Sequence, residues 1–161
     1  MSFNEISNTL WHERQLLELL LFKLEEEQLV LASGRTRWLT HATREVETVL
    51  AEIKRAELGR AVEVEAVAPE LGLTHAPSLQ QLVEHAPEPW SRIFEEHRKA
   101  LLELAGEIDG LAQANRELLT RGQQAARDAL RALTEGVPDT YSPHGVSSGV
   151  RGSLGLVNEA I

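Results

Sequence analysis

Histidine and acidic side chains are the residues of this chain that could bind a metal ion or transfer protons. The six histidines are scattered, and no pair of them has metal-ligand spacing on a helix. His12 and Glu13 begin like the zinc-protease pattern His-Glu-x-x-His, but Leu16 stands where the second histidine belongs. The Glu-x-x-His pattern of di-iron helical bundles does not occur in the sequence. The spacing therefore predicts no metal site.

Other kinds of catalytic chemistry have no better support. The chain has no cysteine, which excludes disulfides and thiolate metal ligands, and it contains no phosphate-binding loop and no nucleophile elbow. Glu25, Glu26 and Glu27 form a run of acidic residues that is typical of a solvated helix face. We expect a protein that is not an enzyme and uses no cofactor.

The net charge of −9 argues against a nucleic-acid partner, because phosphates are bound by clustered lysine and arginine. The largest basic group, Arg35, Arg37 and Arg44, is too sparse for that purpose. The N-terminus lacks the basic region of a signal peptide, and the apolar stretch 19–22 is interrupted at once by Lys23. These features predict a soluble cytoplasmic protein without membrane insertion.

The clearest structural signal is an apolar 4-3 alternation over residues 88–134, which predicts one long helix with an apolar seam. Gly136 and Pro138 are expected to end it. The seam consists of Trp90, Phe94, Leu101, Leu104, Ile108, Leu111, Leu118, Ala125 and Ala129.

Two earlier helices are predicted over 3–32 and 36–67, separated by Ser33 and Gly34, and so short a connection favours an antiparallel hairpin. A short helix is expected at 78–85, where Ser78 and Gln81 form a capping-box pattern. We predict an all-α fold: an elongated antiparallel helical hairpin plus a long third helix, as a coiled-coil-like three-helix bundle. Residues 1–135 form the helical domain, and 136–161 form a flexible, disordered tail.

The long helix exceeds its neighbours by about 14 residues, which gives an overhang of roughly 20 Å at a rise of about 1.5 Å per residue. We expect this overhang at the C-terminal end, near the hairpin turn. Three alternatives stay open, namely that a second copy covers it in a homodimer, that the hairpin extends further than predicted, or that part of the segment 69–89 folds back over it. The residues predicted at the exposed end are Leu118, Leu119, Gly122, Ala125, Ala126, Ala129, Leu130 and Leu133.

Polar and aromatic residues in the helices have structural interpretations. His97 and Asn115 occupy seam positions, where a polar side chain more often fixes helix register than performs chemistry. Trp11, Trp38 and Trp90 are candidates for core packing or for anchoring a partner, and core packing is favoured.

Three stretches of the chain resemble the FlgN family of flagellar export chaperones. They are LWHERQLLELLLFKLEEE from Leu10 to Glu27, GRTRWL from Gly34 to Leu39, and ANRELL from Ala114 to Leu119. The resemblance extends over about residues 5–135. It implies a cytoplasmic helical chaperone that binds the C-terminal helices of hook-associated proteins and delivers them to the type III export gate.

The resemblance also implies locations for these contacts. The C-terminal half of the long helix, from Leu111 to Leu133, corresponds to the cargo-binding region of the family, and Tyr141 corresponds to a tyrosine that contacts the export gate. A homodimeric coiled-coil protein with a structural or signalling role is the alternative, and the chain could also form such a dimer in the absence of cargo.

Overall fold

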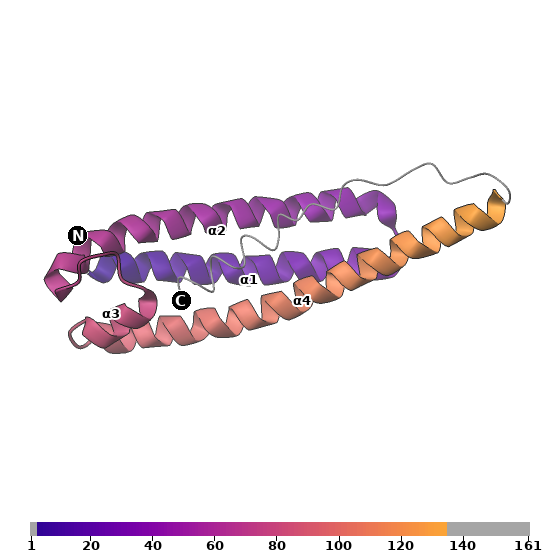
Figure 1. The fold of residues 1–161 in the computed structure, drawn as a ribbon. Coiled ribbons are helices and arrows are strands. Elements are labelled where there is room, and N and C mark those ends of the chain that lie inside the picture. The colour runs from indigo at the N-terminus through magenta and orange to yellow at the C-terminus, as the bar shows by residue number, and fades with distance from the viewer. Residues whose placement is uncertain (1–2, 135–161) are drawn as a thin grey trace.

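The chain folds into an elongated arrangement of helices, seen in a computed structural model that describes residues 3–134 (Figure 1). The residues described form four α-helices and two short 3-10 helices and contain no strand, so the predicted all-α class is confirmed. The tail predicted from residue 136, and Tyr141 within it, lie outside the described residues. The helices are α1, Phe3–Ser33; α2, Leu39–Val67; α3, Leu79–His85; and α4, Trp90–Leu133.

α1 and α2 form an antiparallel hairpin. Thr9 donates a hydrogen bond to Glu63 at one end of the pair, and Thr43 donates one to Glu27 at the other. Gly34 turns the chain with a φ of 71°, a left-handed conformation that glycine adopts without steric cost. A 3-10 helix, Thr36–Trp38, then precedes α2, which is why α2 begins three residues later than the predicted position 36.

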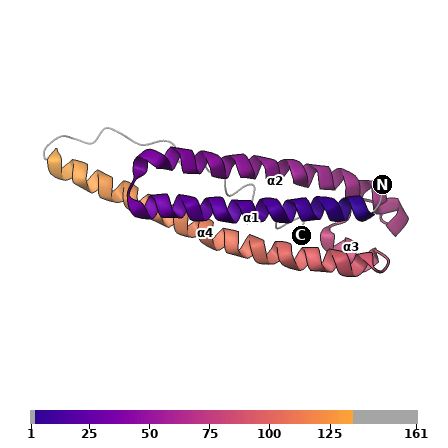
Figure 2. The ribbon, with the colours of Figure 1, turned by 180° about the vertical axis from the view of Figure 1, so that it is seen from behind.

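α4 packs against α1 in the parallel direction. Ser7 Oγ lies 3.1 Å from His97 Nε2, and Asn115 Nδ2 donates to the carbonyl oxygen of Leu24 at 2.9 Å. These pairs are separated by 90 and 91 residues, so each α1 residue lies beside the α4 residue about 90 positions later. α1 accordingly lies between α2 and α4 in both ribbon views (Figures 1 and 2).

The apolar core runs along the bundle and follows the helical periodicity of the sequence. α1 and α4 both present apolar residues at 3-4 spacing to the core, as does α2. The strand-like alternation of residues 62–65 lies inside α2, where Val64 is buried and Val62 is exposed. The largest fully buried apolar side chains are Ile6, Leu10, Leu17, Leu20, Val67, Leu79, Leu82, Phe94, Leu101 and Ile108.

α3 closes the end of the bundle where α4 begins. Ser78 and Gln81 form the predicted capping box, with Ser78 Oγ accepting from the Gln81 amide and Gln81 Oε1 accepting from the Ser78 amide. Ser91 Oγ donates to the carbonyl oxygen of Val83 at 2.6 Å and ties α3 to the first turn of α4. The segment 69–89 therefore lies at the opposite end from the C-terminus of α4 (Figure 1) and does not fold back over it.

α4 continues past the hairpin turn. Its 44 residues exceed the 31 of α1 and the 29 of α2. In the parallel register, Ser33 at the end of α1 lies beside about Gln123, so roughly ten further residues extend beyond the turn, about 15 Å at 1.5 Å per residue. We call residues 121–133 the overhang, because each of them is exposed (Figures 1 and 2).

Candidate functional site

The overhang carries the apolar seam of α4 beyond the bundle. The buried side of α4 includes Leu101, Ile108 and also Ala112, one position after the predicted seam residue Leu111. The same 3-4 spacing then continues along one side of the helix to an apolar stripe of four residues, of which Leu130 is 61% exposed and Leu133 is 82% exposed. This apolar stripe consists of Leu119, Ala126, Leu130 and Leu133.

The structure places most of the nine predicted site residues at the exposed end, but not all of them. Leu111 is partly buried and packs against the core, so it lies inside the bundle. Leu118 and Leu119 are half-buried at the base of the overhang. The six residues that are fully exposed on the overhang are Gly122, Ala125, Ala126, Ala129, Leu130 and Leu133.

Small residues widen this apolar surface. Ala125 and Ala129 each precede a residue of the apolar stripe by one position, about 100° around the helix, and border it on that side. A Cβ atom added at Gly122 would meet nothing within 4 Å. Small side chains let another backbone approach closely, while Leu130 and Leu133 supply the larger apolar area for burial.

Hydrogen bonds to the Glu27 carboxylate link the three long helices at the base of the overhang. Asn115 Nδ2 donates to Glu27 Oε1 at 3.0 Å as well as to the carbonyl oxygen of Leu24, and Thr43 Oγ1 donates to Glu27 Oε2 at 3.1 Å. One carboxylate thus links α1 to both α2 and α4 a few turns before the bundle ends. Asn115 and His97 both bridge α1 and α4 in this way, in agreement with a role in helix register.

Two of the three tryptophans are largely exposed, although the sequence favours core packing for all three. Only Trp90 packs as expected, with its ring centroid 6.0 Å from Phe3 and 6.1 Å from Phe94. Trp38 is 45% exposed because it lies in the 3-10 helix at the turn, outside the helix pairs. Trp11 is 52% exposed at the edge of the α1–α4 contact, where its ring centroid lies 5.1 Å from that of His97.

Sequence reasoning missed a second exposed apolar surface on α1. Trp11, Phe22 and Leu29 are 52%, 57% and 72% exposed and lie 11 and 7 residues apart, which places them on one side of the helix. This side is turned by roughly 130° from the core-facing Leu10, Leu17 and Leu24. The angular positions could have revealed it, but a 3-4 pattern read only for a core face overlooks apolar residues between the chosen positions.

A buried ion pair joins α1 to α2. Arg60 Nε lies 3.1 Å from Glu13 Oε1, and both side chains are at least nine-tenths buried. That oxygen accepts no hydrogen bond. Burial raises the pKa of Glu13 to about 7, although the Arg60 guanidinium lowers it, and nearby Glu57 and Glu63 raise it further.

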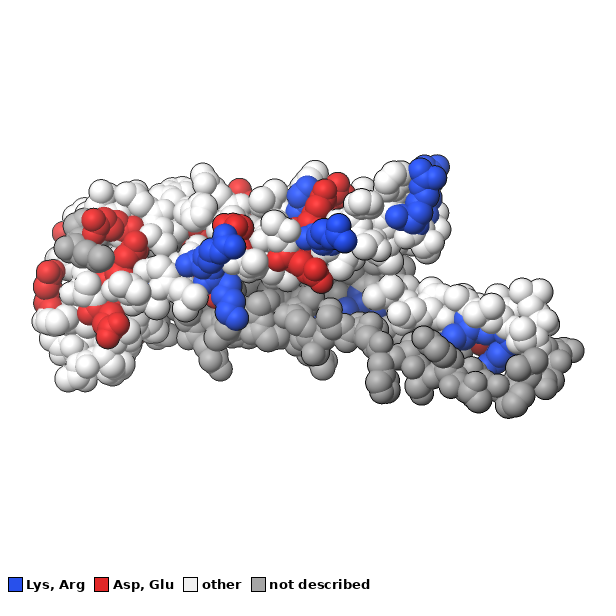
Figure 3. All heavy atoms as spheres, turned by 90° about the horizontal axis from the view of Figure 1, so that it is seen from above, with Lys and Arg blue, Asp and Glu red and all other residues white. Residues whose placement is uncertain are grey.

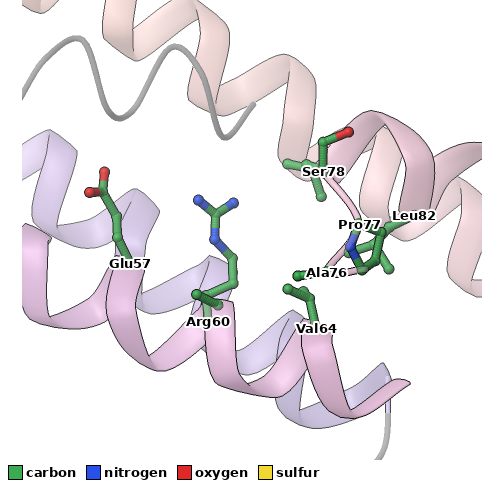
Figure 4. A pocket seen from close by; sticks show the side chains of 9 residues that line it. Glu57, Arg60, Val64, Ala76, Pro77, Ser78 and Leu82 are labelled. Atoms are coloured by element: carbon green, nitrogen blue, oxygen red, sulfur yellow. The ribbon is translucent and has the colours of Figure 1, made fainter. Parts of the chain in front are cut away.

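Arg60 also lines a pocket of about 260 Å³ between α2 and the segment 76–82 (Figure 4). Its other walls are largely apolar, with Val64, Pro77 and Leu82 among them, and Glu57 lies at its edge. Glu13 and Glu57 both interact electrostatically with Arg60, so the guanidinium charge is compensated within the bundle. The pocket lies at the end of the molecule opposite the overhang.

A further buried polar group lies between α1 and α4. His97 Nδ1 lies 3.5 Å from Arg14 Nη1, and the Arg14 guanidinium stacks 4.1 Å from the centroid of the Trp11 ring. Burial and the Arg14 charge lower the pKa of His97 to about 4. This neutral histidine lies between Ser7 and Arg14 of α1 and links α1 to α4.

Two other kinds of site are absent from residues 3–134. Within them, no group of three or more histidine, aspartate or glutamate side chains is arranged to hold a metal ion. None of the helices formed by these residues combines the length and apolarity needed to cross a membrane.

A rigid helical bundle with an apolar helical extension is the architecture of a protein that binds other helices. The comparison with protein families agrees with this class. A family model described as FlgN protein matches residues 1–149, and the chain belongs to the FlgN family. Comparisons with curated proteins and with solved structures gave no match.

Membership of this family gives the function in general terms. FlgN proteins are flagellar export chaperones, which bind hook-associated proteins of the flagellum, and they are not known as enzymes. The resemblance noted from the sequence is thus confirmed at the level of the family.

Proposed function

We propose that this chain binds the C-terminal helices of flagellar hook-associated proteins along the overhang of α4. It acts in the cytoplasm, prevents premature assembly of these proteins and delivers them to the type III export apparatus. The observation that carries the proposal is the continuation of the buried seam of α4 as an exposed apolar stripe. Within residues 3–134, no other element covers the part of this stripe at Ala126, Leu130 and Leu133.

The mechanism follows from helix-in-groove recognition. An amphipathic cargo segment that is unfolded when free would fold as a helix against the apolar stripe and bury its own apolar side. The cost of ordering that segment, typically 2–5 kcal/mol or more, offsets part of the contact energy. The complex is therefore expected to be stable enough to prevent self-assembly and weak enough to release its cargo at export.

The first test is co-purification of the full chain with the C-terminal segments of the hook-associated proteins, by size-exclusion chromatography with light scattering. We expect a one-to-one complex. In calorimetry, Leu130→Asp combined with Leu133→Asp should weaken binding at least thirtyfold, because the loss of even one hot-spot residue from an interface costs about 2 kcal/mol.

Leu58→Asp is the matched control. Leu58 is 62% exposed in the middle of α2, and Leu130 is 61% exposed on the overhang, so both substitutions place a carboxylate at an equally exposed helical leucine. The control should retain the affinity of the unchanged chain. Equal affinity for all three proteins would exclude the overhang as the binding surface.

A homodimer through the overhang is the competing function. Its sign would be a mass that rises with protein concentration and does not change when cargo segments are added. Leu130→Asp would then lower the mass of the free chain, which distinguishes a self-contact from a cargo contact.

The export-gate contact of Tyr141 remains a proposal that rests on the family resemblance. Tyr141→Ala should retain cargo binding and lose binding to the export gate. Loss of both activities would indicate that the region around this residue contributes to cargo binding.

A further inference from the structure

The charge of this chain is distributed unevenly along the fold. Between Gln28 and Arg44, which covers the hairpin turn, there are three arginines and no acidic residue. Between Arg116 and Thr134, which covers the overhang and its base, there are four arginines, one glutamate and one aspartate. The formal charge of these two segments together is +5. Because the whole chain has a net charge of −9, the residues outside the two segments carry −14.

These two positive segments lie at the same end of the molecule. The turn lies beside α4 where the overhang begins, in both ribbon views (Figures 1 and 2). On the face seen in Figure 3, acidic side chains gather at the opposite end of the bundle, acidic and basic ones are mixed along its middle, and basic ones lie at the turn and on the overhang. An acidic protein thus presents its exposed apolar stripe in a locally positive environment.

Helix geometry places the positive charges next to the apolar stripe. Arg127 follows Ala126, and Arg131 follows Leu130, so each arginine lies about 100° around the helix from a residue of the stripe. Asp128 lies about 200° from Ala126, on the far side, where its carboxylate accepts a hydrogen bond from Gln124. One border of the stripe is therefore positively charged, and the overhang's acidic side chain points away from it.

The turn adds an aromatic and cationic group to the same end. The Arg37 guanidinium lies 4.5 Å from the centroid of the Trp38 ring, and Trp38 is 45% exposed. An exposed tryptophan stacked by an arginine offers apolar area and positive charge together.

We infer that the segment bound at this surface is an amphipathic helix whose apolar face is bordered by aspartate and glutamate residues. This inference rests on the proposed function and specifies the chemistry of the cargo. A second copy of this chain fits less well, because its own apolar stripe has the same arginine border and the like charges would repel.

The test uses the full chain and two synthetic amphipathic peptides of about 18 residues, or five helical turns. Both have the same leucine and alanine face, which is bordered by glutamate in one peptide and by lysine in the other. Calorimetry should show at least tenfold tighter binding of the glutamate peptide, with an affinity that falls as NaCl is raised from about 50 to about 300 mM. Equal binding of both peptides, tighter binding of the lysine peptide or no binding of either would overturn the inference.

Two double variants of the chain locate the charge effect. Arg37→Gln with Arg127→Gln should weaken binding of the glutamate peptide about three- to tenfold, since exposed ion pairs each contribute a small part of the affinity. Arg55→Gln with Arg92→Gln lowers the net charge equally, within the body of the bundle, and should change the affinity less than twofold. An equal loss in both would show an effect of net charge alone, which would contradict the inference.

The same variants, tested with the C-terminal segments of hook-associated proteins, separate this inference from the proposed function. Tight binding of those segments that is insensitive to Arg37 and Arg127 would overturn the inference and leave the proposed function standing. Failure of those segments to bind, while the glutamate peptide binds in an arginine-dependent way, would overturn the proposed function instead.

Discussion

The two halves of α4 share one apolar spacing but differ in their surroundings and in their side chains. In the first half, large residues such as Phe94, Leu101 and Ile108 are fully buried against α1 and its neighbours. In the second half the same spacing continues through alanines and two leucines, with Leu130 and Leu133 mostly exposed. The bundle half uses its apolar area for folding, whereas the overhang leaves apolar area available for a partner.

This difference shows why stability and binding can be separated in this chain. Burial of apolar area contributes roughly 25 cal/mol per Å², whether the area is buried on folding or on binding. Residues of the bundle half have already contributed that energy to the fold. Changes in the first half should therefore affect unfolding, and changes in the second half should affect partner binding.

The largest expected effect is the loss of a large side chain from the bundle half. Phe94→Ala should lower the free energy of unfolding by about 3–5 kcal/mol, because it leaves a cavity where the ring of a fully buried phenylalanine was. Leu130→Ala should change the free energy of unfolding by less than about 0.5 kcal/mol, because Leu130 is exposed and alanine and leucine have similar helix propensities. Urea unfolding followed by circular dichroism measures both.

The outcome for Leu130 is the more informative of the two. A loss of several kcal/mol on Leu130→Ala would mean that the overhang is covered in the free protein. The contrast between the halves of α4 would then be wrong.

A second expected difference is in pH dependence, because both strongly shifted groups lie in the bundle. The raised pKa of Glu13, about 7 against an ordinary 4.5, means that its contribution to stability is present below pH 4.5 and is lost as the pH rises through 7. The lowered pKa of His97, about 4 against 6.5, means that its contribution is present above pH 6.5 and is lost as the pH falls through 4.

The two contributions oppose each other between about pH 4.5 and 6.5, so we expect the unfolding free energy of the unchanged chain to vary little there. In the Glu13→Gln variant, the free energy of unfolding should fall by about 2–3 kcal/mol as the pH is lowered across this range. In the His97→Gln variant it should rise by a similar amount. Urea unfolding at several pH values tests this. Parallel slopes in the two variants would show that these groups do not govern the pH dependence.

Helical periodicity made the main elements of this fold predictable. The core faces, the hairpin and the Ser78–Gln81 capping box all follow from residue spacing and local chemistry, and so does an overhang at the C-terminal end of α4. Periodicity identifies which side of a helix is apolar without identifying its neighbours. It therefore could not show that Leu111, the first residue of the predicted cargo-binding region, packs inside the bundle.

Features that depend on contacts between distant residues could not be predicted in this way. The pairing of Glu13 with Arg60 and of Asn115 with Glu27 requires the packing register of the helices, which residue spacing within one helix does not contain. The exposure of Trp11 and Trp38 has the same origin. A tryptophan beside a core position can lie on either side of the helix surface, and the arrangement of neighbouring helices decides which.

A smaller effect is expected at Asn115, the last fully buried seam residue before the overhang. Asn115→Ala should lower the free energy of unfolding by about 1–2 kcal/mol, because it removes two hydrogen bonds to α1. Amide hydrogen exchange should also become faster from Asn115 to the end of α4. Gln113→Ala is the control, because the hydrogen bond from Gln113 to Glu117 is exposed. If both variants behaved alike, the boundary between the bundle half of α4 and the overhang would not lie at Asn115.

The last expected effect is a gain in stability at Gly122, where the effect on cargo binding distinguishes the halves of α4. Gly122→Ala should raise the helical stability of the overhang by about 0.5–1 kcal/mol, because alanine is the better helix former and its Cβ meets nothing within 4 Å. If a cargo backbone approaches Gly122 closely, the same methyl group should weaken cargo binding. Gly110→Ala in the bundle half, where a Cβ also meets nothing within 4 Å, should give the same gain without loss of affinity. Unchanged cargo affinity for both alanine variants, measured by calorimetry, would mean that the partner helix contacts Leu130 and Leu133 without approaching the backbone at Gly122.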